Sequence, residues 1–368
     1  MKARGAVLFQ PGSPLEICDV DVAAPRAGEA LVKMAAAGVC HTDLHVMRGR
    51  FSAPLPAVLG HEGAGVVAEV GPGVTSLKAG DPVVPLWRLS CGVCEYCRRG
   101  RPALCTEGTR IRNTGRLPDG TSRLSLNGRE LKHYAGVSTF CEYSVVPEAA
   151  LLKISREVPL DRAALLGCAV VTGVGAVVNA AKVKPGESVA VFGVGGVGLN
   201  VIQGAALAGA NPIVAVDRHE SKLELAKRLG ATHGVNAASN NAAEQVRALT
   251  GGRGVDHAFD AAGLPETVRA AYDSLAKLGA LVVLGIAPVG TDVALPLTSL
   301  VFEERRILGS FYGSGRPRED IPKLVEQYRT GRLKLDELVT RRYPLEQINE
   351  AYAALDRGEV ARSVVVFD

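Results

Sequence analysis

The chain has 368 residues, which exceeds what one hydrophobic core usually holds and suffices for two domains. Hydrophobic residues make up 47% of it, and a formal net charge of only +4 argues against a nucleic-acid-binding surface. No run of about 18 purely apolar residues and no apolar leader is present, so the sequence predicts neither a membrane span nor a secretory signal. Eight cysteines, several in Cys-x2-Cys spacing, indicate metal ligands rather than disulfides and favour a cytoplasmic location.

The first 169 residues are predicted to form a mostly antiparallel, barrel-like β domain, because short apolar runs alternate with Gly and Pro turns. From residue 170 to about 309 the period changes, and buried strands alternate with helices. The predicted helices are 171–183, 197–208 and 220–231, and the predicted strands are 188–192, 212–217, 254–263 and 280–286. This alternation implies an α/β fold with a doubly wound parallel sheet. The segment 310–368 ends in a strand-like run and is expected to return to the first domain.

A glycine-rich loop, Gly193-Val194-Gly195-Gly196-Val197-Gly198, connects a predicted strand to a predicted helix. In such a loop the first glycine permits a tight turn, the second lets the backbone approach a pyrophosphate, and the third packs the helix on the strand. Asp217 ends the next strand, where its carboxylate can bind the adenosine ribose and repel a 2′-phosphate. The sequence therefore favours NAD, although Arg218 beside it leaves NADP open.

Four cysteines form a Cys-x2-Cys-x2-Cys-x7-Cys box in the loop 88–110: Cys91, Cys94, Cys97 and Cys105. Four thiolates at this spacing can enclose one tetrahedral zinc ion. Iron–sulfur motifs begin alike but continue with x3-Cys-Pro, which is missing here. Basic residues inside the box leave a nucleic-acid zinc ribbon as an alternative, although one short basic loop is more often simply solvated. A closed four-cysteine site has no open position, so its predicted role is structural.

A second set of candidate ligands is Cys40, His61 and Cys168, with Glu62 beside His61. Two thiolates and one imidazole leave a fourth tetrahedral position open for substrate, which is typical of catalytic zinc. Such an ion polarises an alcohol oxygen and lowers its pKa, which prepares hydride transfer to a nicotinamide. From spacing alone the alternative stays open that these are buried, inert core residues.

Five motifs occur in the order found in the zinc-dependent medium-chain alcohol dehydrogenases, and the resemblance covers essentially the whole chain. They are Cys40-His41-Thr42-Asp43, Gly60-His61-Glu62-Gly63-Ala64-Gly65, the cysteine box, Gly167-Cys168 and the glycine-rich loop. The resemblance implies a GroES-like β-barrel catalytic domain (1–169), a Rossmann domain (170–309) and a C-terminal segment (310–368) that completes the first. It also implies an active site in the cleft between the domains and two zinc ions per subunit, a catalytic one at Cys40, His61 and Cys168 and a structural one in the box.

The same resemblance implies roles for the residues around the catalytic metal. Glu62 is the carboxylate that can transiently approach the metal, and Asp43 orients His61. Thr42 accepts the proton of the substrate hydroxyl, and His45 passes it to solvent. A surface histidine on a helix is the alternative reading of His45.

For the cofactor, the resemblance implies several contacts. Asp217 and Lys222 bind the adenosine ribose, while His41 and Arg362 face the phosphates. Thr172, Val197 and Ile286 lie near the nicotinamide.

The substrate pocket is implied to include Trp87, Tyr134, Ala135 and, near its mouth, Arg110. An aromatic wall beside a small residue suits primary alcohols, aromatic and allylic ones included.

The expected activity is the reversible, NAD-linked oxidation of a primary alcohol to its aldehyde, with a small-molecule substrate and neither a nucleic-acid nor a membrane partner. The alternative is a glutathione-dependent formaldehyde dehydrogenase, which chain length and the loop from Arg112 to Tyr134 resemble. Two departures weaken that alternative. Thr109 stands where that branch carries an arginine for the glutathione carboxylate, and the segment between Cys40 and His61 is one residue shorter.

The long loop goes with dimers in the family, so a homodimer is expected. A binding protein without catalysis is the remaining class, and the presence of every expected ligand disfavours it.

Overall fold

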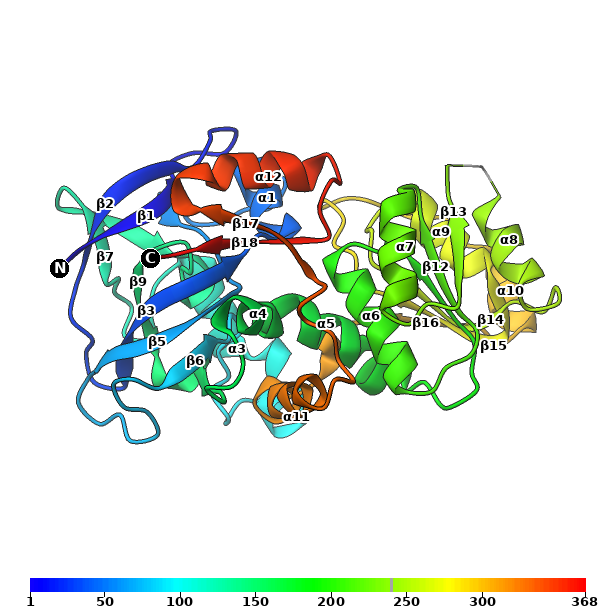
Figure 1. The fold of residues 1–368 in the computed structure, drawn as a ribbon, viewed down its shortest axis with the longest axis horizontal. Helices are drawn as coiled ribbons and strands as arrows, with labels where there is room; N and C mark the ends of the chain where they lie inside the picture. Colours follow the sequence, from blue (N-terminus) through cyan, green and yellow to red (C-terminus); the bar gives the residue numbers. More distant parts are fainter. Residues whose placement is uncertain (239–240) are drawn as a thin grey trace. The chain divides into compact units, whose positions relative to one another are not determined.

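The computed structural model describes residues 1–238 and 241–368, which divide into two compact units (Figure 1). The first unit comprises Met1–Cys168, Arg316–Arg329 and Leu335–Asp368. The second unit comprises Ala169–Gly315 and Thr330–Lys334. Two stretches of the C-terminal segment expected to join the first domain, 310–315 and Thr330–Lys334, therefore belong to the second unit instead.

The first unit contains two β-sheets. A closed barrel has the strand order β1-β2-β7-β8-β4, with β1 Lys2–Leu8, β2 Glu16–Val22, β7 Leu124–Leu126, β8 Arg129–His133 and β4 Ala57–Val58. A second, seven-stranded sheet has the order β10-β6-β5-β3-β18-β17, with β9 also paired to β3. Its strands are β10 Leu151–Lys153, β6 Pro82–Pro85, β5 Gly63–Val70, β3 Glu29–Gly38, β18 Arg362–Val366, β17 Val339–Pro344 and β9 Tyr143–Pro147. The C-terminal strand thus pairs with the central β3.

Helices of the first unit pack against this second sheet, and one of them, His41–Met47, carries several of the predicted site residues. Within the first unit they are α1 His41–Met47, α2 Glu95–Arg98, α3 Thr106–Thr114, α4 Leu160–Leu165, α11 Pro317–Arg329 and α12 Ile348–Asp356. Helices α1 and α12 pack together, and their apolar faces join one core with Phe140 and Leu59. This core supports the segment that carries the predicted metal ligands.

The second unit is built on a six-stranded parallel sheet in the order β13-β12-β11-β14-β15-β16. The strands are β11 Val189–Phe192, β12 Ile213–Asp217, β13 His233–Asn236, β14 Val255–Asp260, β15 Leu275–Val283 and β16 Arg306–Gly309. The helices are α5 Val171–Gly175, α6 Gly196–Leu207, α7 Glu220–Arg228, α8 Ala242–Ala248, α9 Pro265–Asp273 and α10 Leu297–Phe302. Because β11 is wholly apolar and β11 and β14 are almost wholly buried, the centre of the sheet is covered on both faces, as parallel sheets require.

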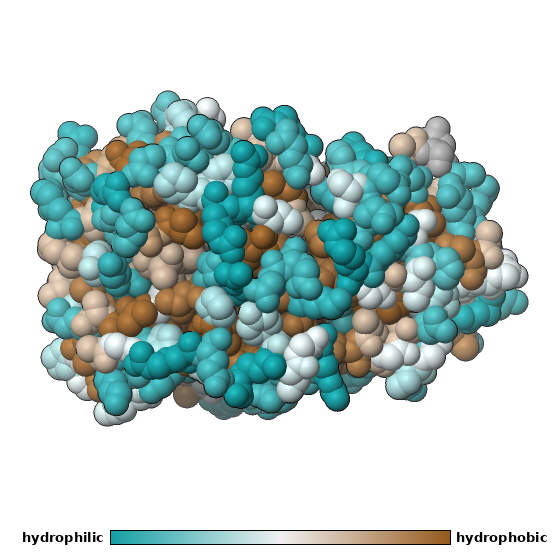
Figure 2. Space-filling model, in the orientation of Figure 1, coloured by the Kyte–Doolittle hydropathy of each residue, from teal (hydrophilic) through white to brown (hydrophobic). Residues whose placement is uncertain are grey.

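One helical run, Leu160–Ala181, is long and apolar enough to cross a membrane by length and composition. However, 78% of its most apolar window is buried inside the protein, a property that core helices share. On the face of the molecule seen in Figure 2, hydrophilic residues separate the hydrophobic ones into small groups.

Candidate active site and metal centres

Three metal-binding side chains from separate elements meet in the first unit. Cys40 directly precedes α1, His61 precedes β5, and Cys168 lies in a π-helical turn, Leu166–Val170. All three are buried, and their ligand atoms lie within 4.8 Å of one another. A hydrogen bond from Cys168 and the nearby charge of His61 lower the pKa of Cys40 well below its ordinary value. This thiol is therefore prepared to bind a metal as a thiolate.

The backbone before His61 requires a glycine. Gly60 has φ +87°, and a β-carbon there would lie 2.6 Å from Thr139 Oγ1 and 2.7 Å from Phe140 N. The Gly60 N–H donates to Asp43 Oδ1 at 3.2 Å, and His61 Nδ1 lies 3.0 Å from Asp43 Oδ2. Asp43 therefore holds the Nδ1 side of the imidazole, which leaves Nε2 facing Cys168 Sγ at 3.4 Å.

Two aromatic rings predicted to line the substrate pocket lie beside this cluster. The Trp87 and Tyr134 rings meet the His61 ring edge-on, with centroids 5.7 and 6.0 Å away. Burial, with the charges of Asp43 and Cys40, raises the pKa of Tyr134 well above its ordinary value, so its phenol stays neutral. Ala135 follows Tyr134 and is buried. That these residues line a substrate pocket stays a prediction.

The predicted proton-transfer residues begin in the first turn of α1. Thr42 Oγ1 lies 3.7 Å from Cys40 Sγ, so its hydroxyl is next to the metal ligands. The His45 ring packs against Phe51 at 4.9 Å and lies 6.5 Å from the His41 ring. Burial and the charge of Arg50 lower the pKa of His45 below its ordinary value, which favours the neutral imidazole, the form that can accept a proton.

Glu62 and Arg362 form a buried ion pair in the first unit. The Glu62 side chain is fully buried and that of Arg362 is 4% exposed. Arg362 opens β18, so the C-terminal strand brings the guanidinium to the segment that follows His61. The structure joins two residues to which separate roles were assigned from the sequence, and those roles toward metal and pyrophosphate stay predictions.

The cysteine box forms a second compact cluster. The four sulfur atoms lie within 4.8 Å of one another, and the Cys91 N–H points at Cys105 Sγ from 3.2 Å. Backbone N–H groups of Cys97 and Thr106 lower the pKa of Cys94 to about 6.

Arg88, a buried residue that the sequence analysis did not single out, fixes the segment ending in Cys105. Its guanidinium donates to Ala103 O at 2.9 Å, Gly108 O at 3.2 Å and Thr109 Oγ1 at 3.0 Å. The sequence feature that could have indicated this role is a single arginine directly after Trp87, where an apolar run ends.

The glycine-rich loop lies in the second unit between β11 and α6. A β-carbon at Gly198 would lie 2.0 Å from Gly193 O, so helix and loop could not approach as they do. At Gly195, by contrast, a β-carbon would meet nothing within 4 Å. That open position fits the close approach of a phosphate group. Asp217 accepts hydrogen bonds from Val194 N and His219 N, both at 3.0 Å, which fixes its carboxylate beside the loop.

Five of the other predicted cofactor residues lie in the second unit, whereas His41 lies in the first, at the start of α1. Thr172, Val197 and Lys222 are half-buried, while Arg218 and Ile286 are exposed. Their contacts with a cofactor stay predictions.

Arg110, predicted near the pocket mouth, is held by its own helix. Its guanidinium pairs with Glu107 at 2.6 and 2.8 Å and donates to Pro118 O at 3.1 Å. Its charge is therefore already balanced by a neighbour, and its contact with substrate stays a prediction.

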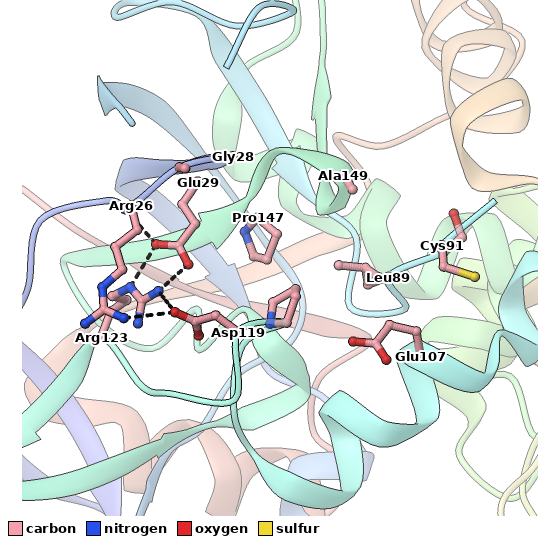
Figure 3. A pocket seen from close by; sticks show the side chains of 13 residues that line it. Arg26, Gly28, Glu29, Leu89, Cys91, Glu107, Asp119, Arg123, Pro147 and Ala149 are labelled. Carbon is pink, nitrogen blue, oxygen red and sulfur yellow. Dashed lines mark hydrogen bonds and ion pairs between the residues drawn. The ribbon is translucent and has the colours of Figure 1, made fainter. Parts of the chain in front are cut away.

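A cavity of about 550 Å³ also lies in the first unit, and its lining does not include Cys40, His61 or Cys168 (Figure 3). At one end of this cavity Arg123 donates to both oxygens of Glu29, at 2.6 and 2.8 Å, and to Asp119 at 2.6 Å. Arg26 also pairs with Asp119. Because these charges satisfy one another, we interpret this group as a structural ion network.

Both clusters fit zinc. Tetrahedral zinc with sulfur and nitrogen ligands separates its ligand atoms by roughly 3.5–3.8 Å, which the two clusters can reach with small adjustments. Four cysteines close one site, whereas two cysteines and one histidine leave a position open in the other. Chain geometry thus matches one structural and one catalytic site.

Comparison with known proteins agrees with this chemistry. Residues 26–156 match the alcohol dehydrogenase GroES-like domain, and residues 196–329 match the zinc-binding dehydrogenase domain. The chain is 45% identical over 99% of its length, and 100% of theirs, to the S-(hydroxymethyl)glutathione dehydrogenases of Synechocystis sp. and Escherichia coli.

Among solved structures, benzyl alcohol dehydrogenase from Acinetobacter calcoaceticus is 36% identical, with a TM-score of 0.95 and full coverage of both chains. A zinc-binding-domain alcohol dehydrogenase from Burkholderia ambifaria is 39% identical with the same TM-score, and the match covers 100% of this chain and 99% of that one. A more distant relative, a zinc-binding dehydrogenase from Sinorhizobium meliloti, was solved bound to NADP. The expected GroES-like and Rossmann architectures and the use of zinc and NAD(P) are thereby confirmed. The chain belongs to the zinc-dependent medium-chain alcohol dehydrogenase family and is an oxidoreductase.

Proposed function

We propose that this protein oxidises the primary hydroxyl of S-(hydroxymethyl)glutathione, the adduct of formaldehyde and glutathione, with NAD as acceptor. The observation that carries this proposal is the 45% identity, over essentially the full length of both chains, to relatives named for that activity. This substrate was the alternative in the sequence-based interpretation, and the relatives favour it over a plain alcohol. The hydroxymethyl carbon loses a hydride to NAD and the hydroxyl loses a proton, so the product is a thioester.

An anionic substrate needs a cation near the pocket, and Arg112 is suited to that role. Helix α3 packs against the turn Tyr134–Gly136 through Ile111, and Arg112 follows it with an exposed side chain. Among the described residues Arg112 has no ion-pair partner, and its charge acts on Tyr134. Thr109, which stands where the glutathione-dependent branch has its arginine, lies one helical turn earlier on the same helix face. We therefore assign the glutathione carboxylate to Arg112.

The chain's own residues would prepare the substrate as follows. Cys40, His61 and Cys168 would hold a zinc ion, which supplies Lewis-acid polarisation of the hydroxyl oxygen while NAD supplies the hydride acceptor. Thr42 takes the hydroxyl proton, and the neutral His45 accepts it in turn. Trp87 and Tyr134 orient the carbon to be oxidised and keep water away.

A second candidate is the oxidation of aromatic primary alcohols. Two observations favour it: the Trp87 and Tyr134 rings beside His61, and the full-length likeness to benzyl alcohol dehydrogenase. A flat ring can stack between such side chains.

The experiment is to follow the formation of reduced nicotinamide with formaldehyde plus glutathione, formaldehyde alone, and benzyl, allyl and ethyl alcohols, each with NAD and with NADP. Strict dependence on glutathione supports the first candidate, whereas turnover of benzyl alcohol without thiol supports the second. Arg112→Ala should raise KM about tenfold or more for the glutathione adduct, as expected for a lost charge-assisted contact, and leave KM for benzyl alcohol unchanged. Thr114→Ala, at the exposed end of the same helix, is the matched control.

We also propose NAD as the preferred cofactor. Asp217 ends β12 with its carboxylate fixed by two backbone N–H groups, so a 2′-phosphate there would meet a negative charge that cannot turn away. Asp217→Ser should therefore narrow the ratio of kcat/KM for NAD over NADP by at least about tenfold, since one poorly compensated charge contact costs more than about 1.4 kcal/mol. An unchanged ratio would contradict this assignment.

We propose a homodimer formed through the second unit. Strand β16 ends the parallel sheet, so its outer edge is unpaired within the sheet. Beside it, Leu297, Val301 and Phe302 of α10 are 69–82% exposed, and Ile307 of β16 is 43% exposed. An apolar patch at a free strand edge suits a second copy of the chain. Phe302→Asp should yield a monomer by light scattering, whereas Val93→Asp, at an exposed site of the first unit, should not.

A cytoplasmic location is also proposed. All eight cysteines are free in the structure, and seven of them belong to the two clusters or are buried, as expected for a protein in a reducing compartment.

A further inference from the structure

The carboxylate of Asp43 is buried without enough donors. It is fully buried, and its donors are the Gly60 N–H and the single N–H of His61, which lies between its two oxygens at 3.0 and 3.2 Å. Although His61 Nδ1 lies 3.0 Å from Oδ2, no group in the described part of the chain makes a hydrogen bond of good geometry to this oxygen. A buried carboxylate stays charged only where donors replace the water that it has lost. One more donor is therefore expected on the Oδ2 side.

Tyr352 brings a phenol to this place from a distant part of the chain. It lies on α12, which packs on α1, and its side chain is 2% exposed. Its ring meets Phe140 edge-on with centroids 6.1 Å apart, and Phe140 is one of the two residues that close over Gly60. Burial raises the pKa of Tyr352 well above its ordinary value, and the adjacent Asp43 and Cys40 raise it further, so the phenol keeps its proton.

The Tyr352 hydroxyl serves no packing purpose that a phenylalanine would not serve equally. The ring already fills its place in the core formed by α1 and α12. Among residues 1–238 and 241–368, however, the Tyr352 oxygen is buried without a hydrogen bond of good geometry, as is Asp43 Oδ2. A buried hydroxyl costs free energy unless it makes a hydrogen bond, and so does a buried carboxylate oxygen. A hydrogen bond from the Tyr352 hydroxyl to Asp43 Oδ2 would satisfy both atoms.

We propose that Tyr352 is a positioning residue of the catalytic zinc site, which donates its hydroxyl proton to Asp43 Oδ2. The hydrogen-bonded series then runs from Tyr352 through Asp43 to His61, and from there to the metal position. Tyr352 keeps Asp43 turned toward His61. Asp43 in turn holds the proton on Nδ1, so the lone pair of Nε2 would be available to the metal ion that His61 shares with the two thiolates. The inference rests on the zinc assignment proposed above.

The test is Tyr352→Phe with Tyr343→Phe as its matched control. Tyr343 belongs to the same core, is 3% exposed and likewise has a buried hydroxyl without a hydrogen-bond partner, but lies on β17. The purified holoenzymes are challenged with dipicolinate, and zinc release is followed with a colorimetric indicator. Tyr352→Phe should release the catalytic zinc about tenfold faster or more, in the range of other partners of metal-bound histidines. Tyr343→Phe should behave as the wild type, and the four-cysteine zinc should be retained in all variants.

A second pair of variants separates positioning from packing. If Tyr352 acts through Asp43, Tyr352→Phe should have no further effect on zinc release in an Asp43→Asn background. Equal acceleration in both backgrounds, or a zinc release rate unchanged by Tyr352→Phe, would overturn the proposal. Wild-type protein that holds no chelator-labile zinc would instead overturn the zinc assignment itself. Thermal melting of each variant shows whether it is folded, and the Asp43→Asn pair still decides the question if Tyr352→Phe alone is unstable.

Discussion

The ion network around Arg123 gives a quantitative prediction about stability. The Arg123 side chain is 1% exposed and that of Glu29 is 6% exposed, so solvent hardly screens their interaction (Figure 3). Replacing Arg123 by Met would leave the Glu29 carboxylate buried with only the Arg26 N–H, at 2.9 Å, as a donor among the contacts described. Removing one partner of a buried pair costs about 3–5 kcal/mol. The loss of the contact between Arg123 and Asp119 should add little to this cost, because Asp119 is 37% exposed and keeps its ion pair with Arg26.

The assay follows from the position of the only tryptophan. Trp87 lies in the first unit, so its fluorescence reports the unfolding of the unit that contains the network. A loss of 3–5 kcal/mol should lower the melting temperature of this unit by roughly 10 °C. Melting of the second unit, followed by calorimetry, should stay unchanged.

The paired variant tests the cause. Replacing both Glu29 and Arg123 by Met removes the two charges together, and apolar replacement of a buried pair is often neutral. The double variant should therefore melt several degrees higher than Arg123→Met alone. If the double variant were as unstable as the sum of both single changes, or if Arg123→Met lost less than about 1 kcal/mol, buried charge pairing would not be the reason.

Three further predictions concern single residues. Burial and the charge of Arg123 lower the pKa of His133 to about 3, so the unfolded chain binds one more proton than the folded one between about pH 3 and 6.5. The free energy of unfolding should thus fall by up to about 1.4 kcal/mol per pH unit on acidification in this window. His133→Gln should reduce this dependence of the free energy of unfolding on pH, whereas His233→Gln, at an exposed position, should not. Gly60→Ala should reduce the free energy of unfolding by about 1–3 kcal/mol, seen as a lower melting temperature, because the new β-carbon would collide with Thr139 and Phe140. The variant should also lose the catalytic zinc, and a full zinc content by metal analysis would contradict this. Cys97→Ser should leave one zinc per chain and destabilise the first unit, and a count of two would exclude the four-cysteine site.

Features that depend on neighbouring residues could be predicted from the sequence. The cysteine box lies within one short loop, and the glycine-rich loop lies between an apolar strand and its helix, so spacing alone indicated both. The central strands β11 and β12 could also be predicted because they are continuous apolar runs, whereas the short, polar strand β13 was not predicted. The three-ligand site needed a family resemblance, since nothing in the spacing of Cys40, His61 and Cys168 shows that they meet.

Contacts between distant segments could not be predicted. Glu29 and Arg123 are joined by the pairing of the barrel and the loop before β7, and Glu62 meets Arg362 only because β18 pairs with β3. Tyr352 is one aromatic residue in an amphipathic helix, and such residues most often only fill a core. Its relation to Asp43 appears once α12 is packed on α1.

The π-helical turn at Cys168 has a consequence for how this chain can change its length. A π turn accommodates one residue more than an α turn, and each residue of an α-helix turns the side-chain direction by about 100°. Loss of one residue between Leu166 and Val170 would let the run from Leu160 continue as a regular helix. The thiol, however, would then leave the helix axis at a different azimuth. A one-residue deletion in this turn would therefore preserve the helix but move the thiol of Cys168 away from the other two candidate metal ligands. The number of residues in the turn is thus constrained by metal binding and not by the stability of the helix.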